Sequence, residues 1–482
     1  MNAGGCLRRT RTWRASVESW STPLAFAIAA LFLVSSVLIS TRRMFWFDEV
    51  FTTLFTRLPD WGGMWRALAR ADDATPFGYY AIARISDRLF GPGEIGIRLP
   101  SAIACTVGLI VTFFCARRLV DGFHGLISIA FLLCSFLPYY ASEGRAYGIY
   151  FLVSAVILWC WFQRSALAFG GAIFCGILIH YYVIFCIVPF AVAEALEWRS
   201  GKRPSRLLMA GALGAFLSLV IQFQQILANR REFGTSFWAS PTLHALRNIY
   251  EDMFPNLLFP VALILICFAI FATDKQKEPA MSDGERVGWL FLLIPLAGFV
   301  CAALVTNAFT ARYFIGALPG VAVAFASLMY RVWHDRAEAT ALVCIILLGF
   351  GGHDSLAKTL HPELTSIGYP LFEVRDALQC EDQIVIDGKR SIVMPDLLLL
   401  PVRYYSKHPD RYVTIVQKAP RATDHTSVRY SARPYLTIDQ VIEHAHEIAF
   451  VNPQPETLSM LRMAKVNLSI QQIRSVTLVY AE

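Results

Sequence analysis

The sequence predicts an all-α polytopic membrane protein of about eleven transmembrane helices, followed by a small extracytoplasmic α/β domain. Hydrophobic residues make up 56% of the 482 residues and charged residues only 16%, whereas soluble domains carry about 25% charged residues. Long apolar runs recur up to residue 353, and the residues beyond them follow a different pattern. Because so few charges cannot cover several soluble domains, most of the chain is expected in a bilayer.

The apolar runs predict the individual spans, since each can cross much of the roughly 30 Å of hydrocarbon in a bilayer. The predicted spans are residues 23–40, 98–116, 125–139, 146–162, 166–179, 181–198, 207–227, 254–272, 287–306, 313–330 and 337–352. As one helix, residues 166–198 would be about 48 Å long, so His180-Tyr181-Tyr182 marks a turn, between two short spans or within a re-entrant hairpin. The first run could be a cleaved signal peptide, but Thr41-Arg42-Arg43 is not a small-residue cleavage site. An uncleaved first helix is favoured.

The basic residues predict the orientation. With a cytoplasmic amino terminus, nearly every basic cluster between spans faces the cytoplasm. An odd number of spans then places the carboxyl terminus outside. The net charge of +7 fits loops that face anionic lipid and does not indicate a nucleic-acid partner. We expect a transmembrane domain over residues 1–353, with a first outer loop at 41–97, and a soluble extracytoplasmic domain over 354–482.

The first outer loop and the tail contain predicted elements outside the spans. Asp60-Trp61-Gly62-Gly63 predicts a turn and a helix start, and residues 76–90 alternate as an interfacial helix does. In the tail the expected strands are 382–387, 412–416, 447–451, 467–472 and 475–480, and the expected helices are 395–405, 437–446 and 456–464. A structural or recognition module is the favoured interpretation of this tail. Most of the eleven cysteines fall in apolar runs and none forms a C-x-x-C, so neither a disulfide framework nor a zinc ribbon is predicted.

Several polar groups gather at the outer ends of the spans. Asp48 and Glu49 follow the first span between aromatic residues, where carboxylates are costly; a solvated loop is the alternative. Asp72 and Asp73 precede Pro76, and taken alone helix capping is the favoured explanation for them. Other candidates are Glu143, Arg145 and Tyr147 after the third span, His180 and Tyr181 at the turn, and Arg312 and Tyr313 at the tenth span.

Each of these residues also has an ordinary explanation as an interfacial side chain. An arginine on the outer side opposes the positive-inside rule, however, and so predicts an anionic partner such as a phosphate. Together the acids and arginines of four loops predict an outer-face site for a phosphorylated lipid.

In order and spacing, these motifs resemble the membrane glycosyltransferases of the GT-C fold over roughly residues 20–330. The chain is similar to the bacterial relatives of protein O-mannosyltransferases, which include the aminoarabinose transferases and the lipid A core galacturonosyltransferases. The resemblance rests on six motifs. The first outer loop contains Asp48-Glu49, the segment from Asp73 to Tyr80 with Pro76 and Tyr79-Tyr80, and Arg98-Leu99-Pro100-Ser101 at its end. The later motifs are Glu143-x-Arg145-x-Tyr147, His180-Tyr181-Tyr182 and Arg312-Tyr313. Thr75 departs from the family, which often has His there.

The resemblance implies transfer of a sugar from a polyprenyl phosphate to a hydroxyl of a glycan, lipid or protein, at the outer face of the inner membrane. Asp48 is then the first choice as general base, with Glu49 or Asp73 positioning the acceptor, and Arg145 and Arg312 stabilise the leaving phosphate. A single displacement would invert the anomeric centre. No cofactor is predicted, and a divalent cation that assists the departure of the phosphate is kept as an alternative. The rival hypotheses are a transporter or flippase of lipid-linked sugars and a scaffold with a degenerate site.

Overall fold

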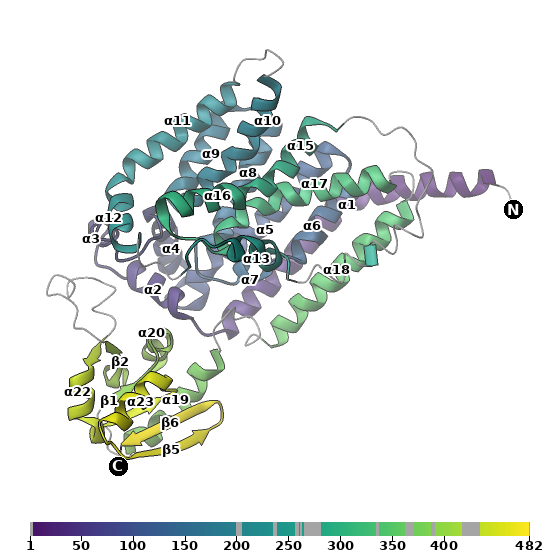
Figure 1. Ribbon diagram of the computed structural model, residues 1–482. Coiled ribbons are helices and arrows are strands. Elements are labelled where there is room, and N and C mark those ends of the chain that lie inside the picture. Colours follow the sequence, from purple (N-terminus) through teal and green to yellow (C-terminus); the bar gives the residue numbers. More distant parts are fainter. Residues whose placement is uncertain are drawn as a thin grey trace. The chain divides into compact units, whose positions relative to one another are not determined.

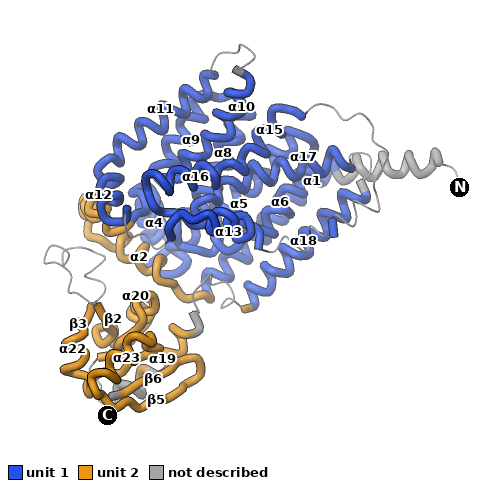
Figure 2. Tube along the Cα trace, viewed as in Figure 1, with its two compact units in different colours: residues 1–41, 74–360 blue, residues 42–73, 361–482 orange. Residues whose placement is uncertain are grey.

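The computed structural model describes residues 3–198, 205–234, 239–255, 260, 263–264, 281–333, 337–361, 371–386, 391–416 and 434–481. The chain folds as two compact units (Figure 2). The helical unit comprises Met1–Thr41 and Ala74–Leu360, and the mixed unit comprises Arg42–Asp73 and His361–Glu482. The first outer loop is therefore divided at Asp73, and its first part belongs to the same unit as the tail. The predicted domains, 1–353 and 354–482, stay a prediction.

The described part of the helical unit contains five helices long and apolar enough to cross a membrane: Glu18–Arg42, Glu94–Leu119, Asp283–Thr306, Ala311–Trp333 and Glu338–Leu360. Helices α11 (Arg206–Ile221) and α12 (Phe223–Phe233) form a pair bent by 70°. Three shorter apolar helices are α6 (Gly122–Leu133), α8 (Tyr147–Phe162) and α9 (Ala166–Ile179). This is a multi-pass membrane protein.

The described spans contain the following elements (Figure 1). They are α1 (Ala3–Arg42), α5 (Glu94–Leu119), η1 (Tyr181–Ile187), α10 (Val188–Trp198), α15 (Asp283–Leu290), η2 (Phe291–Leu293), α16 (Ile294–Cys301), η3 (Ala302–Thr306), η4 (Ala311–Ala317), α17 (Leu318–Trp333) and α18 (Ala337–Leu360). Between them lie α4 (Phe77–Phe90), α7 (Leu137–Ala141) and α13 (Leu243–Met253). Each predicted span overlaps one or more consecutive described helices except 254–272, which lies largely outside the described residues.

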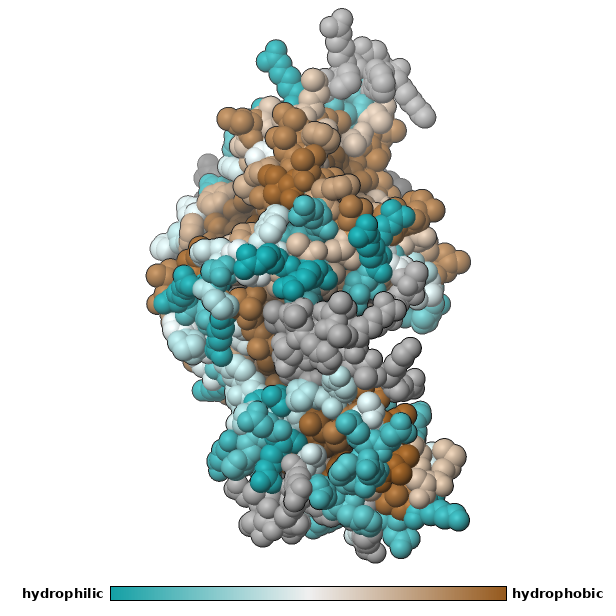
Figure 3. Space-filling model, turned by 90° about the vertical axis from the view of Figure 1, so that its left-hand side faces the viewer, coloured by the Kyte–Doolittle hydropathy of each residue, from teal (hydrophilic) through white to brown (hydrophobic). Residues whose placement is uncertain are grey.

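Small residues allow these helices to approach closely. On α9 and α11, a Cβ added to Gly170 would lie 2.6 Å from the Ala210 carbonyl oxygen, and one added to Gly214 would lie 2.3 Å from the Gly170 oxygen. Close backbone approach at small residues is typical of helix packing in membranes. The outward surface is apolar instead: Leu31, Leu167, Leu304 and Ile345 are all more than 60% exposed. Figure 3 shows apolar side chains gathered on the surface, as expected where lipid is the solvent.

The mixed unit contains a six-stranded sheet in the order β3-β2-β1-β4-β6-β5. Strands β1 (Ser391–Val393), β2 (Tyr412–Val416), β3 (Tyr435–Thr437) and β4 (Ile448–Val451) are parallel, and β6 (Val476–Ala481) runs antiparallel to β4 and to β5 (Leu468–Ile473). Neighbouring residues bury opposite faces: Ile392 belongs to one core and Val393 to another. Both faces are therefore covered, as is usual for parallel strands.

The tail confirms the predicted α/β class but corrects one strand. Residues 382–386 belong to helix α19 (Leu371–Ile386), so the predicted strand 382–387 is wrong. A short apolar run does not distinguish a strand from a buried helix, and here the preceding residues decide. Val374, Ala377 and Glu381 are buried at helical spacing on one face of α19.

The other predicted tail elements are confirmed within about two residues. The helices are α20 (Asp396–Tyr405), α22 (Ile438–Glu443) followed by η8 (Ala445–Glu447), and α23 (Pro455–Met463). The short turn η6 (Pro409–Arg411) precedes β2. Strands β1 and β3 have only three residues each, which is too short for a periodicity to be visible.

Candidate functional site

Arg145 lies in the turn between α7 and α8 and is 7% exposed. Its guanidinium donates from Nη2 to the Thr75 hydroxyl at 2.9 Å and approaches the Tyr80 hydroxyl from Nη1 at 3.5 Å. The adjacent Tyr79 hydroxyl donates to the Gly144 carbonyl. Thr75, Tyr79 and Tyr80 stand at the start of α4, so this helix fixes the direction of the Arg145 side chain.

The Arg98-Leu99-Pro100-Ser101 motif has a structural role beside Arg145. Ser101 donates its hydroxyl to the Arg145 carbonyl at 2.9 Å. The fully buried Arg98 donates to the Ser40 carbonyl at 2.9 Å, near the end of α1 where carbonyls lack helical partners. This motif therefore anchors the turn and the first helix.

Gly78 brings α4 against the end of α9. A Cβ at this position would lie 2.5 Å from the Leu178 carbonyl oxygen, closer than real side chains come to a backbone oxygen. The glycine thus permits the approach that places Tyr79 and Tyr80 beside the α9 terminus. His180 follows at that terminus as the residue that ends α9 and begins η1, so the predicted break at His180 is confirmed.

Tyrosines surround His180. Its ring stacks on Tyr150 with centroids 5.0 Å apart and an interplanar angle of 15°. The rings of Tyr147, Tyr182 and Tyr313 lie 5.6, 5.9 and 5.4 Å away. Nδ1 accepts the Tyr182 backbone N–H at 3.3 Å, so a neutral ring carries its proton on Nε2. We call His180 with these four tyrosines the aromatic cluster.

Arg312 joins the aromatic cluster from the start of η4. Its guanidinium carbon lies 5.8 Å from the Tyr147 ring centroid, which is cation–π geometry. The preceding loop is held by Tyr182, whose hydroxyl donates to the Ala308 carbonyl. Glu143 is 1% exposed, and Glu143 and Arg312 both act electrostatically on the nearby Tyr140. Burial is the main reason why the pKa of Tyr140 lies well above its ordinary value.

The two arginines also act on His180. Burial, followed by the charges of Arg145 and Arg312, lowers the pKa of His180 to about 3. The histidine is therefore neutral at physiological pH, and the positive charge around the aromatic cluster comes from Arg145 and Arg312. Two arginines around a neutral, water-poor cluster can bind an anion.

We expect acid to destabilise the wild type more than His180→Asn. The unfolded histidine binds a proton below about pH 6.5, but the folded one does so only near pH 3. Stability is therefore fully present above pH 6.5 and falls as the pH drops, by about 2 kcal/mol between pH 7 and pH 5. Asn is chosen because its side-chain oxygen can replace Nδ1 as acceptor. Thermal unfolding in detergent at both pH values checks this, and equal acid sensitivity of the two proteins would contradict it.

In the mixed unit, Asp48 and Glu49 stand side by side on the first turn of α2 (Phe47–Thr56). Glu49 is fully buried: Oε1 pairs with Arg43 Nη2 at 3.3 Å, and Oε2 accepts the Trp46 N–H at 3.2 Å. It therefore caps α2 and neutralises Arg43. Asp48 is only half-buried and is the more accessible carboxylate of the two.

The tail holds the segment that carries Asp48. Tyr405 on α20 accepts the Phe45 N–H at 2.8 Å, and the rings of Phe45 and Tyr404 lie 5.3 Å apart. Arg57, just after α2, donates to the Tyr404 hydroxyl at 3.1 Å. These contacts fasten both ends of α2 to α20.

Replacing Tyr405 is expected to loosen α2. Tyr405→Phe leaves the buried Phe45 N–H without its acceptor, which costs about 1–3 kcal/mol. Amide hydrogen exchange across α2 should then be about 5- to 150-fold faster. Tyr404→Phe is the matched control, because it removes only the bond from the exposed Arg57. Equal protection of α2 in both variants would show that Tyr405 does not hold it.

Asp72 follows α3 (Trp61–Ala69) and is 5% exposed. Asp60 caps the start of this helix, as predicted, because its carboxylate accepts the Gly63 N–H at 2.6 Å. Asp73 is half-buried and is the last residue of this part of the mixed unit. Asp48, Glu49, Asp72 and Asp73 thus belong to the mixed unit. Their meeting with the helical-unit residues in one site stays a prediction.

Within the helical unit the predicted residues largely come together. Tyr80 contacts Arg145, and Tyr147, His180, Arg312 and Tyr313 adjoin one another. Tyr181 differs, because its hydroxyl donates to Gln225 on α12 at 3.4 Å. The sequence did not reveal that Thr75 binds Arg145; its place in the motif before Pro76 was the only signal. Among the described residues, no group of three His, Cys, Asp or Glu side chains could hold a metal ion.

The comparisons with known proteins extend over most of the chain. No protein-family model matches it. It is 21% identical over 383 residues to an undecaprenyl phosphate-α-4-amino-4-deoxy-L-arabinose arabinosyl transferase of Edwardsiella ictaluri, covering 72% of this chain and 67% of that protein. It also resembles the apo crystal structure of ArnT from Cupriavidus metallidurans, with a TM-score of 0.57 and 14% identity, over 97% of this chain and 98% of that one.

The chain has the fold of ArnT. The crystal structure of the Cupriavidus protein bound to undecaprenyl phosphate gives a TM-score of 0.59 at 14% identity, over 95% of this chain and 97% of that one. The likeness includes the tail as well as the spans, since it covers nearly the whole chain. The predicted fold class, a helical membrane protein with a small α/β domain, is therefore confirmed.

Proposed function

We propose that this protein is an integral inner-membrane glycosyltransferase. It transfers a sugar from a polyprenyl-phosphate donor to a hydroxyl of a glycan, lipid or protein at the outer face of the membrane, with inversion. The amino terminus is cytoplasmic and the tail extracytoplasmic. The observation that carries this proposal is the placement of Arg145 and Arg312 beside the neutral aromatic cluster, which makes a site for a phosphate.

The reaction needs a cation where the phosphate leaves. The acceptor oxygen attacks the anomeric carbon, and the bond from that carbon to the phosphate oxygen breaks. Its electron pair stays on the phosphate, and polyprenyl phosphate is released. Arginine binds phosphate oxygens through two parallel N–H bonds, and fixed donors aimed at a developing charge are a large source of catalysis. Tyr80 and Thr75 hold Arg145 for this task.

The acceptor hydroxyl needs a base on the opposite side of the sugar. Asp48 is the accessible carboxylate of the pair on α2, whereas Glu49 is committed to Arg43 and to the helix terminus. Asp48 therefore takes the proton of the acceptor hydroxyl. Glu49 fixes the first turn of α2 and thereby positions Asp48. Asp72 and Asp73 bind the acceptor.

The relatives support the choice of donor. The Edwardsiella protein is named for undecaprenyl phosphate and for arabinosyl transfer, and the Cupriavidus protein has been crystallised with undecaprenyl phosphate. Identities of 21% and 14% do not carry over a particular sugar. The proposal therefore names the polyprenyl-phosphate class and leaves the sugar to experiment.

A transfer assay with reconstituted protein tests the function. Proteoliposomes would receive radiolabelled polyprenyl-phosphate sugars and a crude membrane acceptor fraction. We expect label to move to the acceptor, with release of polyprenyl phosphate in equal amount. Movement of intact donor across the bilayer without any transfer would instead identify a flippase. Folded protein that neither transfers nor moves any donor would overturn the proposal in favour of a scaffold.

A further inference from the structure

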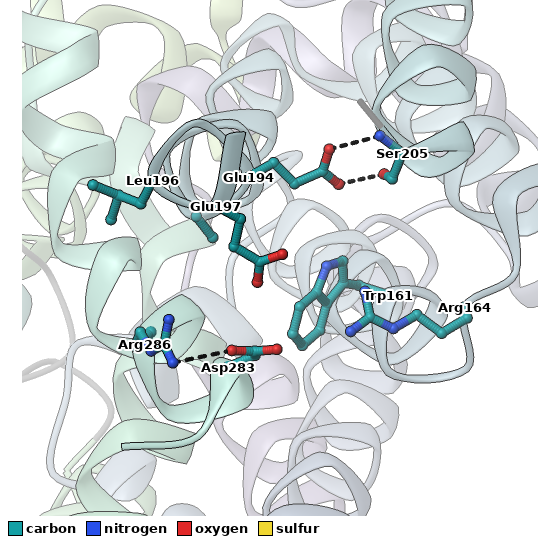
Figure 4. Close-up of a pocket in the computed structure, with 9 residues that line it drawn as sticks. Trp161, Arg164, Glu194, Leu196, Glu197, Ser205, Asp283 and Arg286 are labelled. Carbon is teal, nitrogen blue, oxygen red and sulfur yellow. Dashed lines mark hydrogen bonds and ion pairs between the residues drawn. The ribbon is translucent and has the colours of Figure 1, made fainter. Parts of the chain in front are cut away.

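A pocket of about 280 Å³ lies in the helical unit, away from the aromatic cluster (Figure 4). Four helix ends form it: the end of α8, the end of α10, and the starts of α11 and α15. Arg164 precedes α9 and His180 follows it, so the length of this 14-residue helix, about 21 Å, separates the pocket from the aromatic cluster. The proposed transfer reaction uses none of its residues.

The lining residues carry both signs of charge. The carboxylates are Glu194, Glu197 and Asp283, and the cations are Arg164 and Arg286. Glu194 is committed to structure, because it accepts the Ser205 N–H at 2.9 Å and the Ser205 hydroxyl. Asp283 pairs with Arg286 at 3.3 Å, but both side chains are nearly half exposed, so this pair is weak and can rearrange.

Two carboxylates and an indole ring face the middle of the pocket. In Figure 4 the Glu197 and Asp283 side chains extend toward the Trp161 ring from different helices. Carboxylates beside an aromatic ring are the usual surroundings of a bound ammonium group. A primary ammonium fits better than a quaternary one, because it can donate hydrogen bonds to both carboxylates.

The two arginines supply the complementary half of the site. The Arg164 guanidinium lies 4.6 Å from the centroid of the Trp161 ring. Arg164 also has a φ of 53° just past the end of α8, a position where glycine is the usual residue and another side chain costs about 1–2 kcal/mol. The chain thus carries a guanidinium where a glycine would be less strained. Arg286 lies across the pocket from Arg164 in Figure 4, so each guanidinium can donate to a phosphate diester from its own side.

An exposed apolar side chain lines the pocket. Leu196 is one of its lining residues and is 52% exposed. A polar pocket lined by an exposed leucine suits an amphiphile better than a soluble ion. Pockets for drug-sized ligands measure about 300–1,000 Å³, so this one has room for a head group while the acyl chains stay outside.

We propose that this pocket binds the ethanolamine phosphate head group of a membrane phospholipid. Glu197 and Asp283 bind the ammonium, and Arg164, which lies over the Trp161 ring, binds the phosphate with Arg286. Three carboxylates against two arginines disfavour a purely anionic head group. The proposal does not depend on the transfer reaction.

The test is lipid-dependent thermal unfolding of the full-length, delipidated protein in detergent. Mixed micelles would contain phosphatidylethanolamine, phosphatidylcholine or phosphatidylglycerol with the same acyl chains. We expect phosphatidylethanolamine to raise the Tm most, at the lowest lipid concentration. An equal shift with phosphatidylglycerol would show that the arginines alone bind a phosphate, and no lipid-dependent shift would exclude a site; either result overturns the proposal. Soluble O-phosphoethanolamine that matches the lipid at equal concentration would overturn a lipid source.

Two variants locate the effect in the pocket. Asp283→Asn, which breaks only a half-exposed pair, should raise the phosphatidylethanolamine concentration for a half-maximal shift by at least about tenfold. Glu197→Gln should do the same and provides a second measurement if the first variant unfolds. Glu338→Gln is the control, because it removes an exposed carboxylate at the start of α18. A preference for phosphatidylethanolamine that survives both pocket variants would place the lipid elsewhere.

Discussion

Asp48→Asn is expected to lower the rate of sugar transfer by about 10²- to 10⁴-fold, the usual contribution of a general base. Asn keeps the size of the side chain but cannot take the acceptor proton. Asp48 is half-buried on the first turn of α2, where a carboxylate contributes about 0.3–1 kcal/mol, so its neutralisation should leave membrane insertion intact and lower the Tm only slightly. The measurement is single-turnover transfer from a radiolabelled donor, with thermal unfolding of the same preparation.

Glu49→Gln is the matched control one residue later. Glu49 is fully buried between Arg43 and the Trp46 N–H, so losing its charge should cost about 1.5–3 kcal/mol of stability. The folded fraction should keep transfer within about tenfold of the wild type, since this carboxylate fixes α2 and takes no proton. Full activity of Asp48→Asn would exclude Asp48 as the base. Loss of activity in Glu49→Gln without any loss of stability would assign that role to Glu49.

Arg312→Gln is expected to lower kcat by about 10²- to 10³-fold, as the loss of one donor to a developing negative charge does. The Arg312 guanidinium lies over the Tyr147 ring of the aromatic cluster. Its charge acts on His180 as well, whose pKa is lowered by burial first and then by Arg145 and Arg312. Because the negative charge on the phosphate grows as the bond to the sugar breaks, kcat should fall more than the affinity for the donor. Steady-state kinetics with a defined polyprenyl-phosphate sugar separates the two.

Two further variants make the Arg312 result specific. Arg312→Lys keeps the positive charge but cannot form bidentate hydrogen bonds to the phosphate, so its kcat should lie between those of Arg312→Gln and the wild type. Arg247→Gln removes an exposed arginine on α13 and should have no effect. A rise in KM with unchanged kcat in Arg312→Gln would mean that Arg312 binds the donor without stabilising the transition state.

Much of the helical unit could be predicted because hydropathy is a local property. The break at His180 was visible because no single helix of that length fits a bilayer, and the structure has α9 and η1 on its two sides. The error at 382–387 has the opposite cause. The apolar run Ile384-Val385-Ile386 within that segment suits a strand or a buried helix, and only the packing of Val374 and Ala377 on the same face identifies the helix.

The candidate site was predictable as a set of residues but not as a set of contacts. The motifs named Arg145, His180 and Arg312, and the structure brings all three to one cluster. The bond from Arg145 to Thr75 joins residues 70 positions apart in the chain, so no local pattern could reveal it. The resemblance already preferred Asp48 to Glu49 as the base, and the burial of Glu49 against Arg43 supplies a physical reason that no motif contains.

The sequence by itself determined the membrane class, the positions of most spans and the α/β tail, because these follow from composition and short periodic patterns, and its motifs proposed the residues of the candidate site. Only the tertiary structure decided that residues 42–73 fold with the tail, that Tyr405 holds the segment carrying Asp48, and that a charged pocket forms at four helix ends. The physical reason is that packing and hydrogen bonds join residues hundreds of positions apart, and hydropathy along the chain carries no information on which of them meet.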